Sequence, residues 1–155
     1  MFMNFWLLLH VIGVVLFVGN IITAAFWKVR ADAQKNAAII HHAAKNVMYA
    51  DYAFTLPGLV CIVISGIAMA VQANISMRGL NWLSLSLILF AVTGIVWLAI
   101  LIPLQRAMIR HSAACIESGA ISGAYSRASR LWAVFGTVGT LLPLLILYFM
   151  TTKSF

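Results

Sequence analysis

The chain has 155 residues, of which 64% are hydrophobic and only 8% are charged, and its mean hydropathy is +1.04. A water-soluble domain of this length needs far more charge to cover its surface, so the composition excludes a soluble globule and predicts one integral membrane domain over residues 1–155. The formal charge of +7 indicates anionic lipid headgroups as the partner rather than nucleic acid, because few residues lie outside apolar segments.

Four apolar stretches approach or exceed the roughly 20 residues that a helix needs to cross a hydrocarbon core of ~30 Å. They cover residues 5–27, 53–71, 82–104 and 131–150. The first has no basic start and no small-residue cleavage site, so we expect it to remain in the mature protein. The predicted fold class is all-α, a transmembrane four-helix bundle. Aromatic residues near the span ends are expected to form interfacial belts: Trp6, Trp27, Trp82, Trp132 and Tyr148.

Two of the connections between the spans are long and basic. Residues 31–49 are rich in Ala, Lys and Gln and are predicted to continue as helix into the second span. The third helix is expected to extend beyond its span, and Gly119 and Gly123, with Ser118 and Ser122, mark the break between this extension and the start of the last helix. The sequence therefore predicts helical extensions at one end of the bundle.

The distribution of basic residues orients the bundle. Only Arg78 and Lys153 lie on the side of the termini and of the short 74–81 loop. The positive-inside rule therefore places both long connections in the cytoplasm and both termini outside. The basic residues on the predicted cytoplasmic side are Lys28, Arg30, Lys35, Lys45, Arg106, Arg110, Arg127 and Arg130.

One face of the first span combines polar and small side chains. It carries His10, Gly13, Phe17, Asn20 and Ala24, spaced so that they fall on one side of a helix. In one interpretation His10 and Asn20 only hydrogen-bond a neighbouring helix. In the other, His10 is an axial ligand of a haem b whose flat face packs on Gly13.

A second axial ligand must lie at the same depth as His10. At a rise of ~1.5 Å per residue, Gly66 and Met69 of the second span reach that depth, so Met69 is the candidate opposite ligand. The alternative is the same histidine of a second subunit across a two-fold axis, which implies a homodimer. Arg78 and Lys153 are candidates to neutralise haem propionates, and otherwise they extend to lipid headgroups.

Other titratable residues gather at the predicted cytoplasmic end. His41, His42, His111 and Cys115 offer soft-metal ligands on two helical extensions, although a polar helix surface produces such neighbours by chance. Asp51 precedes the apolar part of the second span.

We expect Asp51 to cap its helix or to pair with Arg30, Arg106 or Arg130. No paired carboxylates, Ser-His-Asp set or phosphate-cradling loop is found in the sequence, which disfavours hydrolase and nucleotide-driven functions.

Two segments carry a family resemblance. LLLHVIGVVLFVGNIITAAFWKVRAD in the first helix and ADYAFTLPGLVCIVISGIAMA in the second resemble a family of small bacterial inner-membrane proteins with four helices. More distantly, they resemble the superfamily of the copper-resistance CopD proteins and the HemJ-type protoporphyrinogen oxidases. The resemblance extends through LLPLLILYFMTTKSF at the end of the chain.

In the HemJ-type enzymes a histidine at the position of His10 is implicated in haem b binding. Their lysine early in helix three is replaced here by the apolar and Ser residues of 83–87. The resemblance therefore implies a haem pocket rather than protoporphyrinogen oxidation.

The sequence is compatible with three functions. The leading hypothesis is a b-type haem-binding inner-membrane protein for electron transfer or haem handling, a haem-dependent oxidoreductase if it is an enzyme. The second is a non-catalytic scaffold or accessory subunit of a larger membrane complex, which would use small-residue faces for packing. The third is copper passage or sensing.

Overall fold

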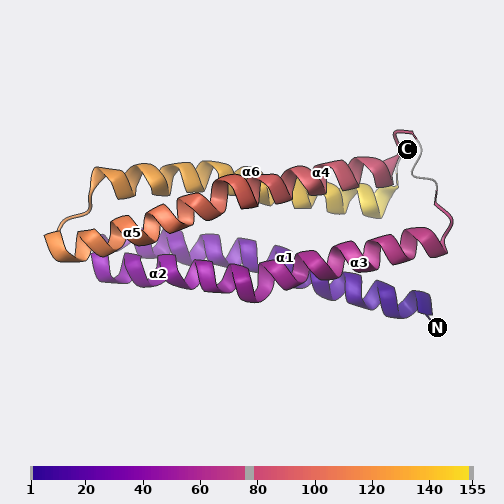
Figure 1. Cartoon of the computed structure of the whole chain (residues 1–155), viewed down its shortest axis with the longest axis horizontal. Coiled ribbons are helices and arrows are strands. Elements are labelled where there is room, and N and C mark those ends of the chain that lie inside the picture. Colours follow the sequence, from indigo (N-terminus) through magenta and orange to yellow (C-terminus); the bar gives the residue numbers. More distant parts are fainter. Residues whose placement is uncertain (1, 76–78, 154–155) are drawn as a thin grey trace.

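The computed structural model describes residues 2–75 and 79–153, and all regular structure in this part of the chain is helical (Figure 1). Four continuous helical crossings are each long and apolar enough to span a membrane, which confirms the predicted fold class. The first and last crossings are α1 (Phe2–Ala33) and α6 (Gly123–Thr152). The second consists of α2 (Ala37–Ala50), the π-helical turn η1 (Asp51–Thr55) and α3 (Leu56–Gln72). The third consists of α4 (Trp82–Val96), the π-helical turn η2 (Trp97–Leu101) and α5 (Ile102–Ser118).

The turns at 34–36 and 119–122 lie together at one end of the bundle, which we call the basic end (Figure 1). The start of α1, the end of α3, the start of α4 and the end of α6 lie at the other, the terminal end. Asn36 caps α2 by accepting hydrogen bonds from two backbone N–H groups. Gly119 ends α5 with a left-handed φ of 71°, and Ser122 caps α6. The predicted helical extensions and the predicted break near Gly119 are therefore confirmed.

The second and third crossings each contain one π-helical turn followed by a proline. The amide of Leu56 bonds the carbonyl of Asp51, and the amide of Ile102 bonds that of Trp97, each five residues back. Pro57 and Pro103 come next. A proline lacks the N–H for the usual bond and its ring collides with the carbonyl four residues earlier, so a wider turn just before it relieves the helix.

The four crossings pack differently at the two ends of the bundle. At the terminal end they form two pairs, α1 with α3 and α4 with α6 (Figure 1). Among the described residues, no Cα of α3 comes within 8 Å of one in α4 or α6. At the basic end, α2 and α5 pack together and join the pairs around one apolar core. The members of this core include Ile40, Ala44, Val47, Leu101, Met108 and Trp132.

The α1/α3 pair is held by a close approach of two backbones. A Cβ atom on Gly13 would lie 2.9 Å from the Cβ of Cys61 and 2.9 Å from the carbonyl oxygen of Gly58. Small residues at a helix crossing allow this approach, which drives helix association in lipid. The space beside Gly13 is therefore occupied by α3 in this structure, and the role of Gly13 beside a porphyrin stays a prediction.

The close approach predicts different outcomes for two glycines of α1. Gly13→Ala should lower the free energy of unfolding by about 1–3 kcal/mol, because the added methyl group overpacks the crossing. Gly19→Ala is the matched control, since no atom lies within 4 Å of its Cβ position. It should gain up to about 1 kcal/mol of helix propensity. Thermal midpoints of the two purified variants in detergent measure the difference, and equal midpoints would contradict the proposed packing.

Candidate functional site

His10 lies half-buried at the interface between α1 and α3, near the terminal end. Its Nδ1 is 3.0 Å from the hydroxyl oxygen of Ser65. That hydroxyl also lies 2.5 Å from the carbonyl oxygen of Cys61, to which it can donate, and it is then free to accept a proton from the imidazole. An imidazole that donates from Nδ1 in this contact has its lone pair on Nε2.

Gly66 lies against the imidazole, since a Cβ at this position would be 3.5 Å from Cε1 of His10. This confirms that the two residues share one depth. Met69 is half-buried on the same helix, one turn beyond Ser65. Its role as the opposite ligand stays a prediction.

Of the two cationic residues expected to neutralise haem propionates, Lys153 is among the described residues and Arg78 is not. Lys153 ends α6 and places its ammonium 5.5 Å from the ring centroid of Trp82. Both assignments stay predictions.

Asp51 is the centre of a buried polar network between three crossings. It is 6% exposed and begins η1. Its Oδ1 accepts hydrogen bonds from the Asn20 amide and the Thr55 hydroxyl, both at 2.9 Å. Its Oδ2 accepts from Gln105 Nε2 at 2.6 Å and from Trp97 Nε1 at 3.4 Å. Four donors therefore converge on one carboxylate.

This network corrects one expectation from the sequence and agrees with another. Asp51 lies inside a continuous helix and bonds neutral donors rather than capping a helix end or pairing with an arginine. Asn20 points to η1, where its amide also bonds the Thr55 hydroxyl at 2.9 Å, as expected in the interpretation that it hydrogen-bonds a neighbouring helix. Its role at a cofactor stays a prediction. Because hydrocarbon offers no hydrogen bonds, these side chains must satisfy one another.

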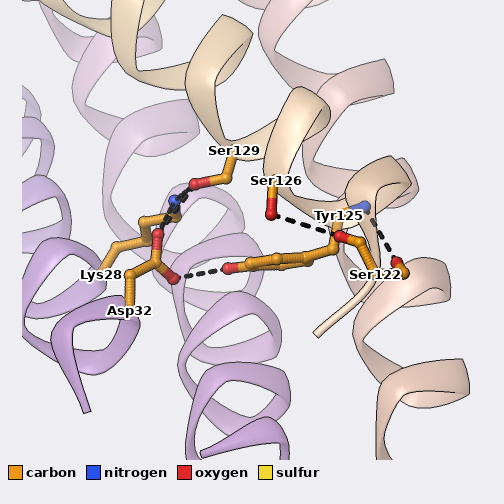
Figure 2. Close-up of polar contacts among 6 residues, drawn as sticks. All are labelled: Lys28, Asp32, Ser122, Tyr125, Ser126 and Ser129. Carbon is orange, nitrogen blue, oxygen red and sulfur yellow. Dashed lines mark hydrogen bonds and ion pairs between the residues drawn. The ribbon is translucent and has the colours of Figure 1, made fainter. Parts of the chain in front are cut away.

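A second polar network joins α1 to α6 at the basic end (Figure 2). Lys28 is only 2% exposed, and its ammonium forms a 2.5 Å ion pair with Asp32 and a hydrogen bond with Ser129. Tyr125 reaches across from α6 and donates its phenolic proton to Asp32 at 2.6 Å. Ser129 also donates to Asp32, at 2.8 Å. The carboxylate of Asp32 is thus surrounded by donors from both helices.

The ammonium of Lys28 also lies near two aromatic rings. Its Nζ is 5.8 Å from the ring centroid of Tyr125 and 5.4 Å from that of Trp132. Trp132 is 7% exposed, so the expectation that it belongs to a lipid-facing belt is wrong. Trp27, by contrast, is 65% exposed. Sequence reasoning missed this network, although Lys28 and Asp32 stand at i, i+4, the spacing of a helical ion pair.

The candidate soft-metal ligands are not brought together. Within residues 2–75 and 79–153, no three His, Cys, Asp or Glu side chains form a group that could hold a metal ion. His41 bonds the Ser112 hydroxyl at 2.9 Å, whereas His42 is exposed. The thiol of Cys115 instead accepts the backbone N–H of Ser122 at 3.2 Å.

Comparison with known proteins gives one match. Residues 5–154 match the family DUF2269, described as a predicted integral membrane protein. No curated protein and no solved structure matches the chain. The likeness to the CopD and HemJ-type proteins therefore stays a prediction.

The Asp51 network predicts a large effect of one buried carboxylate on stability. Asp51→Ala leaves four donors without their acceptor in an apolar interior, and should lower the free energy of unfolding by about 3 kcal/mol. Glu117→Ala, on the exposed end of α5, should stay within about 0.5 kcal/mol of the wild type. Thermal midpoints in detergent compare the two. Equal midpoints would show that the network contributes little.

Proposed function

We propose that this chain, which belongs to the DUF2269 family of predicted integral membrane proteins, binds a b-type haem through His10 in a bacterial inner membrane. The protein would serve electron transfer or haem handling near the terminal end of the bundle. The observation that carries this proposal is the hydrogen bond of 3.0 Å between Nδ1 of His10 and the hydroxyl of Ser65.

The hydrogen-bond chain from His10 through Ser65 to the Cys61 carbonyl is suited to metal ligation. Histidines that bind a metal through one ring nitrogen nearly always donate the other ring N–H to a protein acceptor, which fixes the tautomer and raises the basicity of the ligating nitrogen. Ser65 supplies that acceptor and is fully buried. His10 would therefore present Nε2 to the iron.

The depth of His10 also supports a cofactor. An ionisable residue within a membrane span is a candidate functional residue because lipid penalises it. A haem supplies one-electron chemistry at iron, and the contribution of this chain would be to hold the iron and to exclude water. The second axial ligand would be Met69, or His10 of a second subunit in a homodimer.

The arrangement of the helices supports one alternative, an accessory subunit of a larger membrane complex. Both helix pairs carry exposed apolar side chains at the terminal end, such as Val71 of α3 and Leu144 of α6. A partner helix could cover these side chains. Co-purification of a stoichiometric partner without a bound cofactor would favour this function.

Haem binding is tested by absorption spectroscopy of the purified protein. The wild type, expressed with ample haem, should show a Soret band, and His10→Ala should abolish it. Ser65→Ala should weaken haem affinity about 10- to 100-fold, because it removes the acceptor that orients the imidazole. His41→Ala is the matched control, since this histidine is also held by a serine but lies at the basic end. A colourless wild type, or a Soret band in His10→Ala, would refute the proposal.

The positive-inside rule further supports a cytoplasmic basic end and outward termini. Gln34→Cys and Thr151→Cys introduce thiols at exposed positions of the basic and terminal ends. A membrane-impermeant maleimide applied to intact spheroplasts should label the second variant and not the first. The wild type is the blank, because Cys115 is 2% exposed and Cys61 lies within a span. Labelling of the first variant and not the second would show that the basic end faces outward, opposite to the proposed orientation.

A further inference from the structure

The second and third crossings lose regular helical bonds at one common level of the bundle. In η1 and η2 the bonds reach five residues back, and the prolines that follow, Pro57 and Pro103, supply no N–H. The two turns lie side by side, because Trp97 Nε1 of η2 is 3.4 Å from Asp51 Oδ2 of η1. Helices change direction most easily at prolines and at π-helical turns, so both crossings can bend at this level.

The two continuous helices, α1 and α6, are easier to bend at the same level. In α1, Asn20 bonds η1, and the Thr23 hydroxyl donates to the carbonyl of the neighbouring Gly19 at 2.8 Å. In α6, a Cβ on Gly139 would lie 3.5 Å from a leucine side chain of η2, and Pro143 supplies no N–H to the Gly139 carbonyl. Glycine, a threonine bonded to its own helix and proline all weaken a helix locally. All four crossings are therefore weakened at the level of η1 and η2.

The packing differs on the two sides of this level. Toward the basic end, all four crossings surround one apolar core. Toward the terminal end, α1 packs on α3 and α4 packs on α6 (Figure 1). Within the described chain, no Cα of α4 lies within 8 Å of one in α1 or α3. The two pairs are therefore joined by the core at one end and are separate at the other.

The buried polar side chains of the pairs bond within their own pair. Ser86 and Thr93 of α4 each donate to a carbonyl four residues back on the same helix. Ser65 of α3 lies within hydrogen-bonding distance of the Cys61 carbonyl and of His10 on α1. Separation of the two pairs would break none of these bonds. Polar groups in hydrocarbon therefore do not oppose such a motion.

An aromatic contact connects the two pairs. The rings of Phe17 on α1 and Phe90 on α4 meet edge to face, with centroids 6.3 Å apart. Phe17 is 3% exposed and precedes Asn20 by three residues, so the contact lies on the terminal side of the Asp51 network. Such a ring pair shifts an equilibrium by only about 2- to 10-fold. The contact therefore favours the closed arrangement without fixing it.

We propose that the α1/α3 pair and the α4/α6 pair move apart and together in the membrane plane, by rotating at the level of η1 and η2. The Asp51 network keeps the crossings joined at this level, through Asn20 on α1 and Gln105 on the third crossing. The Phe17–Phe90 contact holds the closed arrangement. Because α3 has 17 residues and is about 25 Å long, a rotation of about 15° moves its far end by about 6 Å. The motion requires no haem.

Pulsed EPR between spin labels tests the motion in the full-length protein, in nanodiscs of phosphatidylcholine and phosphatidylglycerol. Ile67→Cys with Leu147→Cys labels exposed positions of the second and last crossings near the terminal end. His42→Cys with Arg127→Cys labels exposed positions of the same crossings at the basic end. The first pair should give a distance distribution that is broader by about 6 Å or has two peaks, and the second a single narrow peak. Equal widths would overturn the proposal.

The labelled variants share one background. Cys61→Ala removes a half-buried thiol and keeps the Cβ atom that packs on Gly13. Cys115 is 2% exposed and stays unlabelled.

Phe90→Ala tests the aromatic contact. It should raise the population of the longer terminal-end distance about 2- to 10-fold and leave the basic-end distance unchanged, which also shows that the variant is folded. Phe5→Ala is the matched control, because Phe5 is 57% exposed and its ring meets Trp6 of the same helix. An unchanged population in Phe90→Ala, or an equal rise in both variants, would overturn the role of the contact.

Discussion

The carboxylate of Asp51 ties together three crossings of this bundle at a depth where lipid offers no hydrogen bonds. It accepts from Asn20 on α1, from Thr55 within η1, and from Trp97 and Gln105 on the third crossing. Each of these donors would be costly to bury alone, and a buried carboxylate would be costlier still. Their mutual satisfaction therefore specifies which faces of α1, η1 and η2 meet, since a rotation of any helix would leave polar atoms in hydrocarbon.

The two π-helical turns explain how the network is assembled. Asp51 begins one turn and Trp97 begins the other, and their side chains are within hydrogen-bonding distance. Each turn precedes a proline, which prevents the regular bond four residues back. The wider turn shifts the register of the helix, so that side chains on either side of it face different neighbours. The bundle therefore has a four-helix core at the basic end and two separate helix pairs at the terminal end.

The two polar networks and His10 divide the molecule by depth. Lys28 and Asp32 lie on α1 at the basic end, and His10 lies on α1 toward the terminal end. Asp51 contacts α1 between them, through Asn20. Along the helix, Lys28 is eight residues from Asn20, or about 12 Å at 1.5 Å per residue. His10 thus places an imidazole within an apolar span, whereas the basic end carries the ion pair of Lys28 and Asp32.

The sequence by itself determined the four crossings, the helical extensions and the common depth of His10 and Gly66, because these depend on apolar length, helix-ending residues and the fixed rise of a helix. It also indicated that the face of Gly13 and Asn20 turns inward. Only the tertiary structure decided what that face meets: Gly13 contacts Gly58 and Cys61, and Asn20 bonds Asp51. Only the tertiary structure likewise showed that Gln105 donates to Asp51 and that Lys28 and Trp132 are buried. Periodicity identifies the face of one helix, but hydrogen bonds between helices also depend on π-helical turns and on the angle between the axes, which no local pattern contains.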